Sequence, residues 1–207
     1  TAARQCQRIL EGWEVYICPS VMPKFGVLQI EPTQKQIREI FLNRIIQAKG
    51  LSQAQSLLSD ILMPTPSAVL LAMELLAKGC EGESGIGDLI GVDVGGATTD
   101  VYSMADGMPE QMNTVYKGLP EPFSKRTVEG DIGMRYSVGG ILEAAGVQRV
   151  SALSGIAPAR VEELVAYLRA NTDRLPDGDK ELEALDQALA SLAVETAVAR
   201  HAGTMEA

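Results

Sequence analysis

The stretch GDLIGVDVGGATTDVYSM, residues 87–104, decides how this chain folds. Two apolar runs flank a central GGATT, and an aspartate closes each side of it, Asp93 before and Asp100 after. A strand–turn–strand unit accounts for the apolar runs and the glycines, because glycine allows a tight turn with no side chain in the way. A purely structural turn has no need of the two acids. The sequence therefore predicts strands over 89–94 and 100–104, with a functional turn between them.

Composition and charge exclude several classes of function. The 207 residues carry a net charge of −9, whereas sequence-independent nucleic-acid binding needs a basic face. No apolar run is long enough to cross a bilayer, and no signal-peptide pattern opens the chain. The cysteines Cys6, Cys18 and Cys80 show no paired spacing and suit a reducing cytosol. We expect a cytoplasmic protein that binds neither nucleic acid nor membrane.

Helices are expected to dominate on both sides of the hairpin, which makes the fold class α/β. Apolar periodicity and end signals predict helices over 2–10, 33–50, 52–63, 65–78, from 131 to 145, from 158, and over 177–202. Short strands are expected at 13–18 and 113–117, with a flexible connector at 80–88. The chain opens within a helix and stops just after one, so we expect an internal fragment. Its predicted parts are an N-terminal α/β segment, 1–62, and a lobe bearing the hairpin, 63–207.

The chemistry of the turn points to a polyphosphate with a metal ion. Backbone N–H groups that converge at a glycine turn bind anions, and threonine hydroxyls add donors. Because carboxylates repel a bare phosphate, Asp93 and Asp100 are predicted to hold a hydrated Mg²⁺ and to orient an attacking water. The predicted donors to the nucleotide are Gly95, Gly96, Ala97, Thr98 and Thr99. A P-loop would need a Lys-Ser or Lys-Thr pair, and a dinucleotide fingerprint would open a helix.

Other polar residues leave alternatives open. Lys125 and Arg126 are expected in a loop, either solvated or in contact with a phosphate or an acidic partner. Asp131 is interpreted as a helix N-cap, with Glu129 and Asp131 as outer-shell metal candidates. His201, the sole histidine, suits a helix C-terminus better than catalysis. The leucines of the last predicted helix are interpreted as core rather than as a partner-binding stripe.

DVGGATTD, residues 93–100, resembles the second phosphate-binding hairpin of the superfamily that contains sugar kinases, heat-shock chaperones and actin. That resemblance implies an incomplete ribonuclease-H-like lobe with many helices. MPTPSA, residues 63–68, is similar to the start of the connecting helix in the chaperones, where an acid precedes the Pro-Thr pair. Met63 stands in that place here, which implies that water activation depends on other groups or is slow.

A resemblance to the MutL (GlmL) family covers nearly the whole chain. It rests on VMPKFGVLQIEP, REIFLNRIIQAKGLS, ILMPTPSAVL, DVGGATTDVYS, GLPEPFSKRTVEGDIGMRYS and RHAGT. It implies an ATP-binding and Mg²⁺-binding accessory factor, a reactivating chaperone of adenosylcobalamin-dependent glutamate mutase. The family's N-terminal G-S-T-x-T-K turn and C-terminal G-T-G-G turn are absent from these residues, so we expect the chain alone to be inactive.

Two other functions and one structural question stay open from the sequence. A related lobe occurs in ATP-dependent hydantoinases and acetone carboxylases, which would make the protein an enzyme acting on a small substrate. A non-hydrolysing interaction scaffold is the other alternative. Homo-oligomerisation is compatible with either reading, because no residue pattern decides the oligomeric state.

Overall fold

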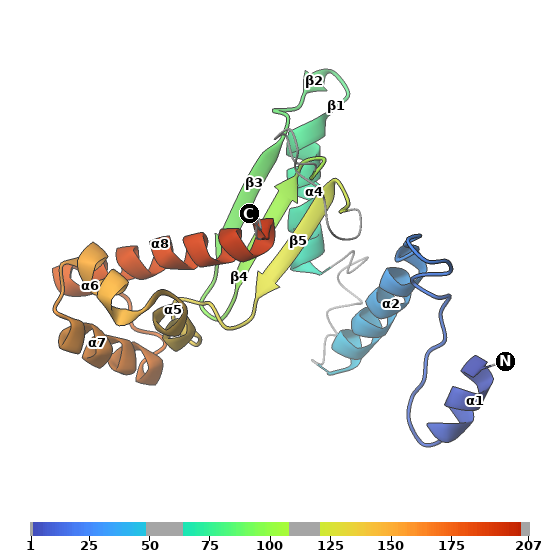
Figure 1. Ribbon diagram of the computed structural model, residues 1–207, viewed down its shortest axis with the longest axis horizontal. Coiled ribbons are helices and arrows are strands. Elements are labelled where there is room, and N and C mark those ends of the chain that lie inside the picture. The colour runs from blue at the N-terminus through green and yellow to red at the C-terminus, as the bar shows by residue number, and fades with distance from the viewer. Residues whose placement is uncertain (1, 49–63, 108–120, 204–207) are drawn as a thin grey trace. The chain divides into compact units, whose positions relative to one another are not determined.

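The structure, a computed structural model, describes residues 2–48, 64–107 and 121–203 (Figure 1). The chain divides into two compact units, Thr1–Ala68 with Lys117–Leu119, and Val69–Tyr116 with Pro120–Ala207. The described residues form seven helices and two small antiparallel sheets, which confirms the mixed α/β class. The predicted boundary after residue 62 lies outside the described residues and stays a prediction.

The N-terminal unit contains two helices, α1 (Ala2–Ile9) and α2 (Glu31–Ala48). Residues 13–18 form no strand, so that prediction is wrong: an apolar run becomes a strand only where a second strand pairs with it. Helix α2 begins at Glu31, two residues before the predicted start. Thr33 therefore lies inside the helix instead of capping it, and its Oγ1 is 3.3 Å from the Sγ of Cys18.

The predicted helix before the hairpin is present as α4 (Thr65–Lys78). Gly79 follows it with φ of +82°, a left-handed conformation that glycine adopts without strain. The expected connector contains a short antiparallel pair, β1 (Gly79–Cys80) with β2 (Glu83–Ser84). The predicted helix over 52–63 and strand over 113–117 lie outside the described residues.

The hairpin forms as predicted and belongs to a three-stranded antiparallel sheet. Its strands are β3 (Leu89–Val94) and β4 (Thr99–Met104), and β5 (Ser124–Glu129) pairs with the other edge of β4. The loop predicted for Lys125 and Arg126 is wrong, because both residues lie in β5. Polar side chains are compatible with an edge strand whose backbone is held by its neighbour.

Alternation along the strands gives this sheet two different faces. One face, called here the aspartate face, carries Asp93, Asp100, Tyr102 and Arg126; the opposite one, the α8 face, carries Thr99, Val101, Ser103 and Thr127. Helix α8 (Lys180–Ala202) runs across the three strands on the α8 face (Figure 1). Helix α4 packs against the aspartate face far from the turn, where Ala77, Tyr102 and Met104 form a small core.

Four helices after the sheet share the main core: α5 (Val138–Ala145), α6 (Val147–Ser154), α7 (Pro158–Ala170) and α8. The core interpretation of the leucine stripe is confirmed, because the leucines at positions 182, 185, 189 and 192 are buried. The predicted helix start at Asp131 is wrong. Helix α5 begins at Val138 after Ser137, and Asp131 instead lies 3.3 Å from Arg200.

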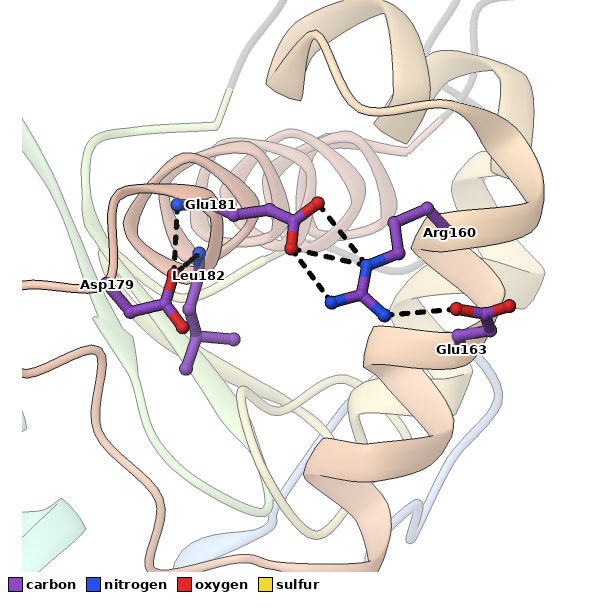
Figure 2. Close-up of polar contacts among 5 residues, drawn as sticks. All are labelled: Arg160, Glu163, Asp179, Glu181 and Leu182. Carbon is purple, nitrogen blue, oxygen red and sulfur yellow. Dashed lines mark hydrogen bonds and ion pairs between the residues drawn. The ribbon is translucent and has the colours of Figure 1, made fainter.

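The start of α8 is fixed by its own cap and by a neighbouring helix (Figure 2). The carboxylate of Asp179 accepts from the backbone N–H groups of Glu181 and Leu182 at 3.1 and 3.2 Å, which satisfies donors that have no partner inside the helix. Arg160 of α7 binds Glu181 of α8 and Glu163 of its own helix.

Among the described residues, no helix combines the length and the apolarity that a bilayer crossing requires.

Candidate functional site

The two aspartates predicted as a pair are brought together by the hairpin. Asp93 and Asp100 are opposite each other in the β3–β4 ladder, so both side chains leave the same face a short distance apart. Asp93 is exposed and has no hydrogen-bond or ion-pair partner among the described residues. Two like charges placed opposite each other destabilise a sheet. The arrangement therefore favours a cation beside them.

The turn itself presents free backbone donors. The N–H of Gly95 donates to the carbonyl of Thr98 at 2.9 Å. The next three N–H groups, those of Gly96, Ala97 and Thr98, have no acceptor within the described part of the chain. Successive N–H groups in a turn conformation can provide an anion-binding site. The sequence predicted backbone donors at Gly95, Gly96 and Ala97; the N–H of Gly95 is already engaged, and anion binding by the others stays a prediction.

The carbonyl side of the turn is held by residues 132–136, called here the supporting loop. The Gly95 carbonyl accepts from the N–H of Met134 at 3.0 Å, and that of Gly96 accepts from Arg135 and Tyr136 at 2.8 Å each. A Cβ atom at Gly133 would lie 2.4 Å from the carbonyl carbon of Ala97, so only glycine allows this approach. The turn is thereby fixed on one side and open on the other.

The two threonines of the turn are placed differently. Thr99 is fully buried on the α8 face and donates through Oγ1 to the carbonyl of Ile132 at 3.0 Å. Thr98 is half-buried and its hydroxyl has no partner among the described residues. The hydroxyl of Thr98 is therefore available to a ligand, whereas that of Thr99 attaches the hairpin to the supporting loop.

The glycines of the turn are needed for space. Neither Gly95 nor Gly96 has a positive φ. A Cβ at Gly95 would lie 2.9 Å from the carbonyl oxygen of Thr98, whereas one at Gly96 would meet only ordinary contacts, at 3.8 Å and beyond. Gly95 is consequently required by the narrow hairpin, and Gly96 leaves room above an exposed N–H.

Arg126, expected in a loop with contact to a phosphate or an acidic partner as one alternative, lies on the aspartate face and binds an acid. Its Nη2 lies 2.5 Å and its Nε 2.8 Å from Oδ1 of Asp100. Burial raises the pKa of the Tyr102 hydroxyl beneath them; the charges of Asp100 and Asp93 add to the rise, and Arg126 opposes it. The TVE run after Arg126 was the available signal for a strand, since β-branched residues favour strands.

A second missed residue, Arg135, anchors the supporting loop. Its guanidinium makes two bonds to Asp186 of α8, at 2.6 and 3.1 Å, and donates to the carbonyls of Arg174 and Met134 at 3.0 and 2.7 Å. Arg135 is 9% exposed. A buried arginine bound in this way fixes loop and helix together, because every lost partner would leave a charge unpaired.

The remaining sequence candidates have structural partners. His201 is buried in α8, with Nδ1 2.7 Å from Oγ1 of Thr127 and Nε2 2.8 Å from Oγ of Ser103. Burial, assisted by Lys125, lowers the pKa of His201. Glu129 forms an ion pair with Arg200 at 2.5 Å. These contacts hold α8 on the sheet and lie on the face opposite the paired aspartates.

Two further observations bear on ligands. Within the described ranges, no cluster of three or more His, Cys, Asp or Glu side chains could hold a metal by itself. The donor set of the hairpin, two carboxylates beside free N–H groups, fits a cation that keeps most of its water and is shared with a phosphate.

A hollow of about 260 Å³ between α7 and α8 is lined by Arg160, Glu163, Tyr167 and Arg174, among others. Its Arg160 is already neutralised by Glu163 and Glu181.

Comparison with known proteins gives one consistent result. The sequence pattern of the family described as MutL protein matches residues 1–207. Protein MutL of Clostridium tetanomorphum is 45% identical over 190 residues, which make up 92% of this chain and 41% of that protein. The chain thus spans about two fifths of the length of this curated relative. No solved structure matches it.

Proposed function

The chain belongs to the MutL protein family, and from this premise we propose that it is part of an ATP-binding factor that assists glutamate mutase. In this proposal the complete protein has about the length of its clostridial relative, works in the cytoplasm, and restores a mutase whose adenosylcobalamin has been inactivated. The described hairpin supplies one phosphate-binding element of a ribonuclease-H-like lobe. The other phosphate-binding element of the nucleotide site belongs to parts of the complete protein outside these residues.

The observation that carries the proposal is a row of three N–H groups with no acceptor among the described residues, in a turn whose carbonyls accept hydrogen bonds from the supporting loop. Preorganised donors bind an anion without the cost of ordering them at the moment of binding. The N–H groups of Gly96, Ala97 and Thr98, with the Thr98 hydroxyl, would contact phosphate oxygens. Thr99 supports the turn, since its hydroxyl is engaged by Ile132.

The two aspartates would hold Mg²⁺ through its water shell, because this ion dehydrates reluctantly and is commonly held by one or two carboxylates together with phosphate. When bound, magnesium nucleotide supplies a phosphoryl group that can be transferred to water. Asp93 is exposed and has no partner within the described residues, so its carboxylate is free to accept a hydrogen bond from that water and orient it. Asp100 is held in place by Arg126.

Titration calorimetry with Mg-ATP on the complete protein tests the binding part of this proposal. Asp93→Asn should weaken binding by at least about tenfold, as the loss of an ion-positioning group typically does. Asp88→Asn is the matched control, because Asp88 is exposed just before β3, far from the turn. Equal affinity for both variants and the unchanged protein would contradict the assignment.

Turnover separates the functions that share such a hairpin. A reactivating factor should hydrolyse ATP faster when inactivated glutamate mutase is present, and Asp93→Asn should abolish the stimulation. Turnover driven by a small cyclic amide would instead identify a hydantoinase-like enzyme. A protein that shows neither turnover nor thermal stabilisation by Mg-ATP would be a scaffold, and the proposal would fail.

A further inference from the structure

The protein itself already places one positive charge beside the paired aspartates, the guanidinium of Arg126. Arg126 lies in β5 opposite Tyr102 of β4, one diagonal step from Asp100 on the same face. Its Nη2 and Nε both address a single oxygen, Oδ1 of Asp100, at 2.5 and 2.8 Å. The other oxygen of that carboxylate has no partner within the described ranges, so it can accept from a second cation's water.

Partial burial makes this pair more than a surface contact. The side chain of Asp100 is 13% exposed and that of Arg126 is 32% exposed, so solvent screens the two charges less than at an open surface. Tyr102, 1% exposed, lies opposite Arg126 in the ladder, and its hydroxyl interacts with the same guanidinium. The guanidinium has five N–H donors in a planar fork, more than its contacts with Asp100 use.

A fixed positive charge acts oppositely on the two components of magnesium nucleotide. It repels a bare divalent ion that approaches Asp93 and Asp100, and it attracts the polyphosphate. With Arg126 in place, the net charge of the three side chains is −1; without it, the net charge is −2. The guanidinium should therefore make the site poor for a free ion and good for a metal already bound to phosphate.

We propose that Arg126 is a specificity-determining residue that makes the hairpin select metal-bound polyphosphate over the free metal ion. This inference rests on the proposed function, since it assigns a role within the same site. It goes beyond that function in predicting that one side chain shifts two affinities in opposite directions. A residue that merely maintained the fold would lower both.

The test measures binding to the complete protein of two probes separately: Mn²⁺ alone, by electron paramagnetic resonance, and Mg-ATP, by calorimetry. Arg126→Gln should tighten Mn²⁺ binding about tenfold and weaken Mg-ATP binding about tenfold, as expected for a unit charge at this distance after partial screening. Arg126→Lys should keep both affinities within about threefold of the original, because the charge is retained. Arg149→Gln, in an exposed pair with Glu195, is the control and should change neither.

A second variant tests the same idea by adding charge. Val128 is opposite Asp100 and 47% exposed, so Val128→Lys places a further cation beside the carboxylate without disturbing Arg126. Compared with Val128→Gln, it should weaken Mn²⁺ binding and strengthen Mg-ATP binding. This comparison decides the question if Arg126→Gln fails to fold.

The outcomes distinguish a failure of the proposed function from a failure of the role assigned to Arg126. If the unchanged protein does not bind Mg-ATP, the proposed function fails and the role of Arg126 fails with it. If it binds Mg-ATP, and the charge changes leave the two affinities equal or move them in the same direction, only the role of Arg126 is overturned.

Discussion

The two faces of the three-stranded sheet differ in how completely their polar groups are bonded. On the α8 face, Thr99 donates to Ile132, and His201 lies between Ser103 and Thr127. On the aspartate face Asp93, and in the adjoining turn three backbone N–H groups, have no partner among the described residues. Neighbouring residues of the same strands supply both faces, because side chains alternate.

This difference shows how a short hairpin can be rigid and still bind a ligand. A buried, fully bonded face fixes the position of the turn, since an unpaired buried polar group is costly. The open side then presents Asp93 and the N–H groups of the turn, which have no competing partner among the described residues. We therefore expect substitutions on the α8 face or in the supporting loop to lower stability first. Substitutions among the unpartnered groups of the turn and the aspartate face should lower binding alone.

The largest effect on the closed side is expected from Arg135→Ala. The substitution leaves Asp186 and the carbonyl of Arg174 without their donors in a partly buried place. Removing one partner of a buried ion pair costs about 4 kcal/mol, measurable by urea unfolding. Arg149→Ala, which removes an exposed pair with Glu195, should cost far less. Equal losses for the two variants would show that Arg135 does not anchor the loop.

The next largest effect should come from Gly133→Ala. Its new methyl group would lie 2.4 Å from backbone of Ala97, so the supporting loop must move away from the turn. We expect a loss of about 3 kcal/mol together with weaker nucleotide binding. Gly130→Ala is the matched control, because nothing lies within 4 Å of a Cβ there. A Gly133→Ala protein with unchanged thermal stability would contradict the close approach.

Adjacent threonines sharpen the comparison between faces. Thr99→Val keeps the side-chain shape but leaves the buried carbonyl of Ile132 without its donor, which should cost about 1.5 kcal/mol. Thr98→Val should hardly change stability and should reduce nucleotide affinity instead. Thermal unfolding of both variants checks the expected stability loss in Thr99→Val, and calorimetry checks the expected affinity loss in Thr98→Val. Identical behaviour of the two would mean that the faces do not divide these roles.

The smallest effect concerns pH. Because burial lowers the pKa of His201 in the folded protein, the unfolded chain binds the proton more readily near its ordinary pKa of about 6.5. Stability contributed by neutral His201 is present above that pH and is lost as the pH falls below it, by under about 1.4 kcal/mol per pH unit. Unfolding between pH 7.5 and 5.5, as approximate limits for a histidine, should show a steeper fall in the unchanged protein than in His201→Gln. Parallel curves would contradict this assignment.

The sequence predicted the parts of the site that local patterns encode. Alternating apolar residues and the glycine turn located both hairpin strands to within one residue, and the leucine spacing identified the buried side of α8. Strand β5 escaped prediction because the SKR run looks like a loop until β4 pairs with it. The pairing of Arg126 with Asp100, and any role for Arg135, escaped prediction for a related reason: the partners Asp100 and Asp186 are remote in sequence, so no local spacing links them.

The central claim is that the hairpin binds magnesium polyphosphate. It is tested most directly by a crystal structure of the complete protein with Mg²⁺ and a non-hydrolysable ATP analogue. The account predicts phosphate oxygens within about 3.2 Å of the backbone nitrogens of Gly96, Ala97 and Thr98, with the metal's water shell touching Asp93 and Asp100. A phosphoryl tail bound elsewhere, with those three N–H groups facing only solvent, would contradict it.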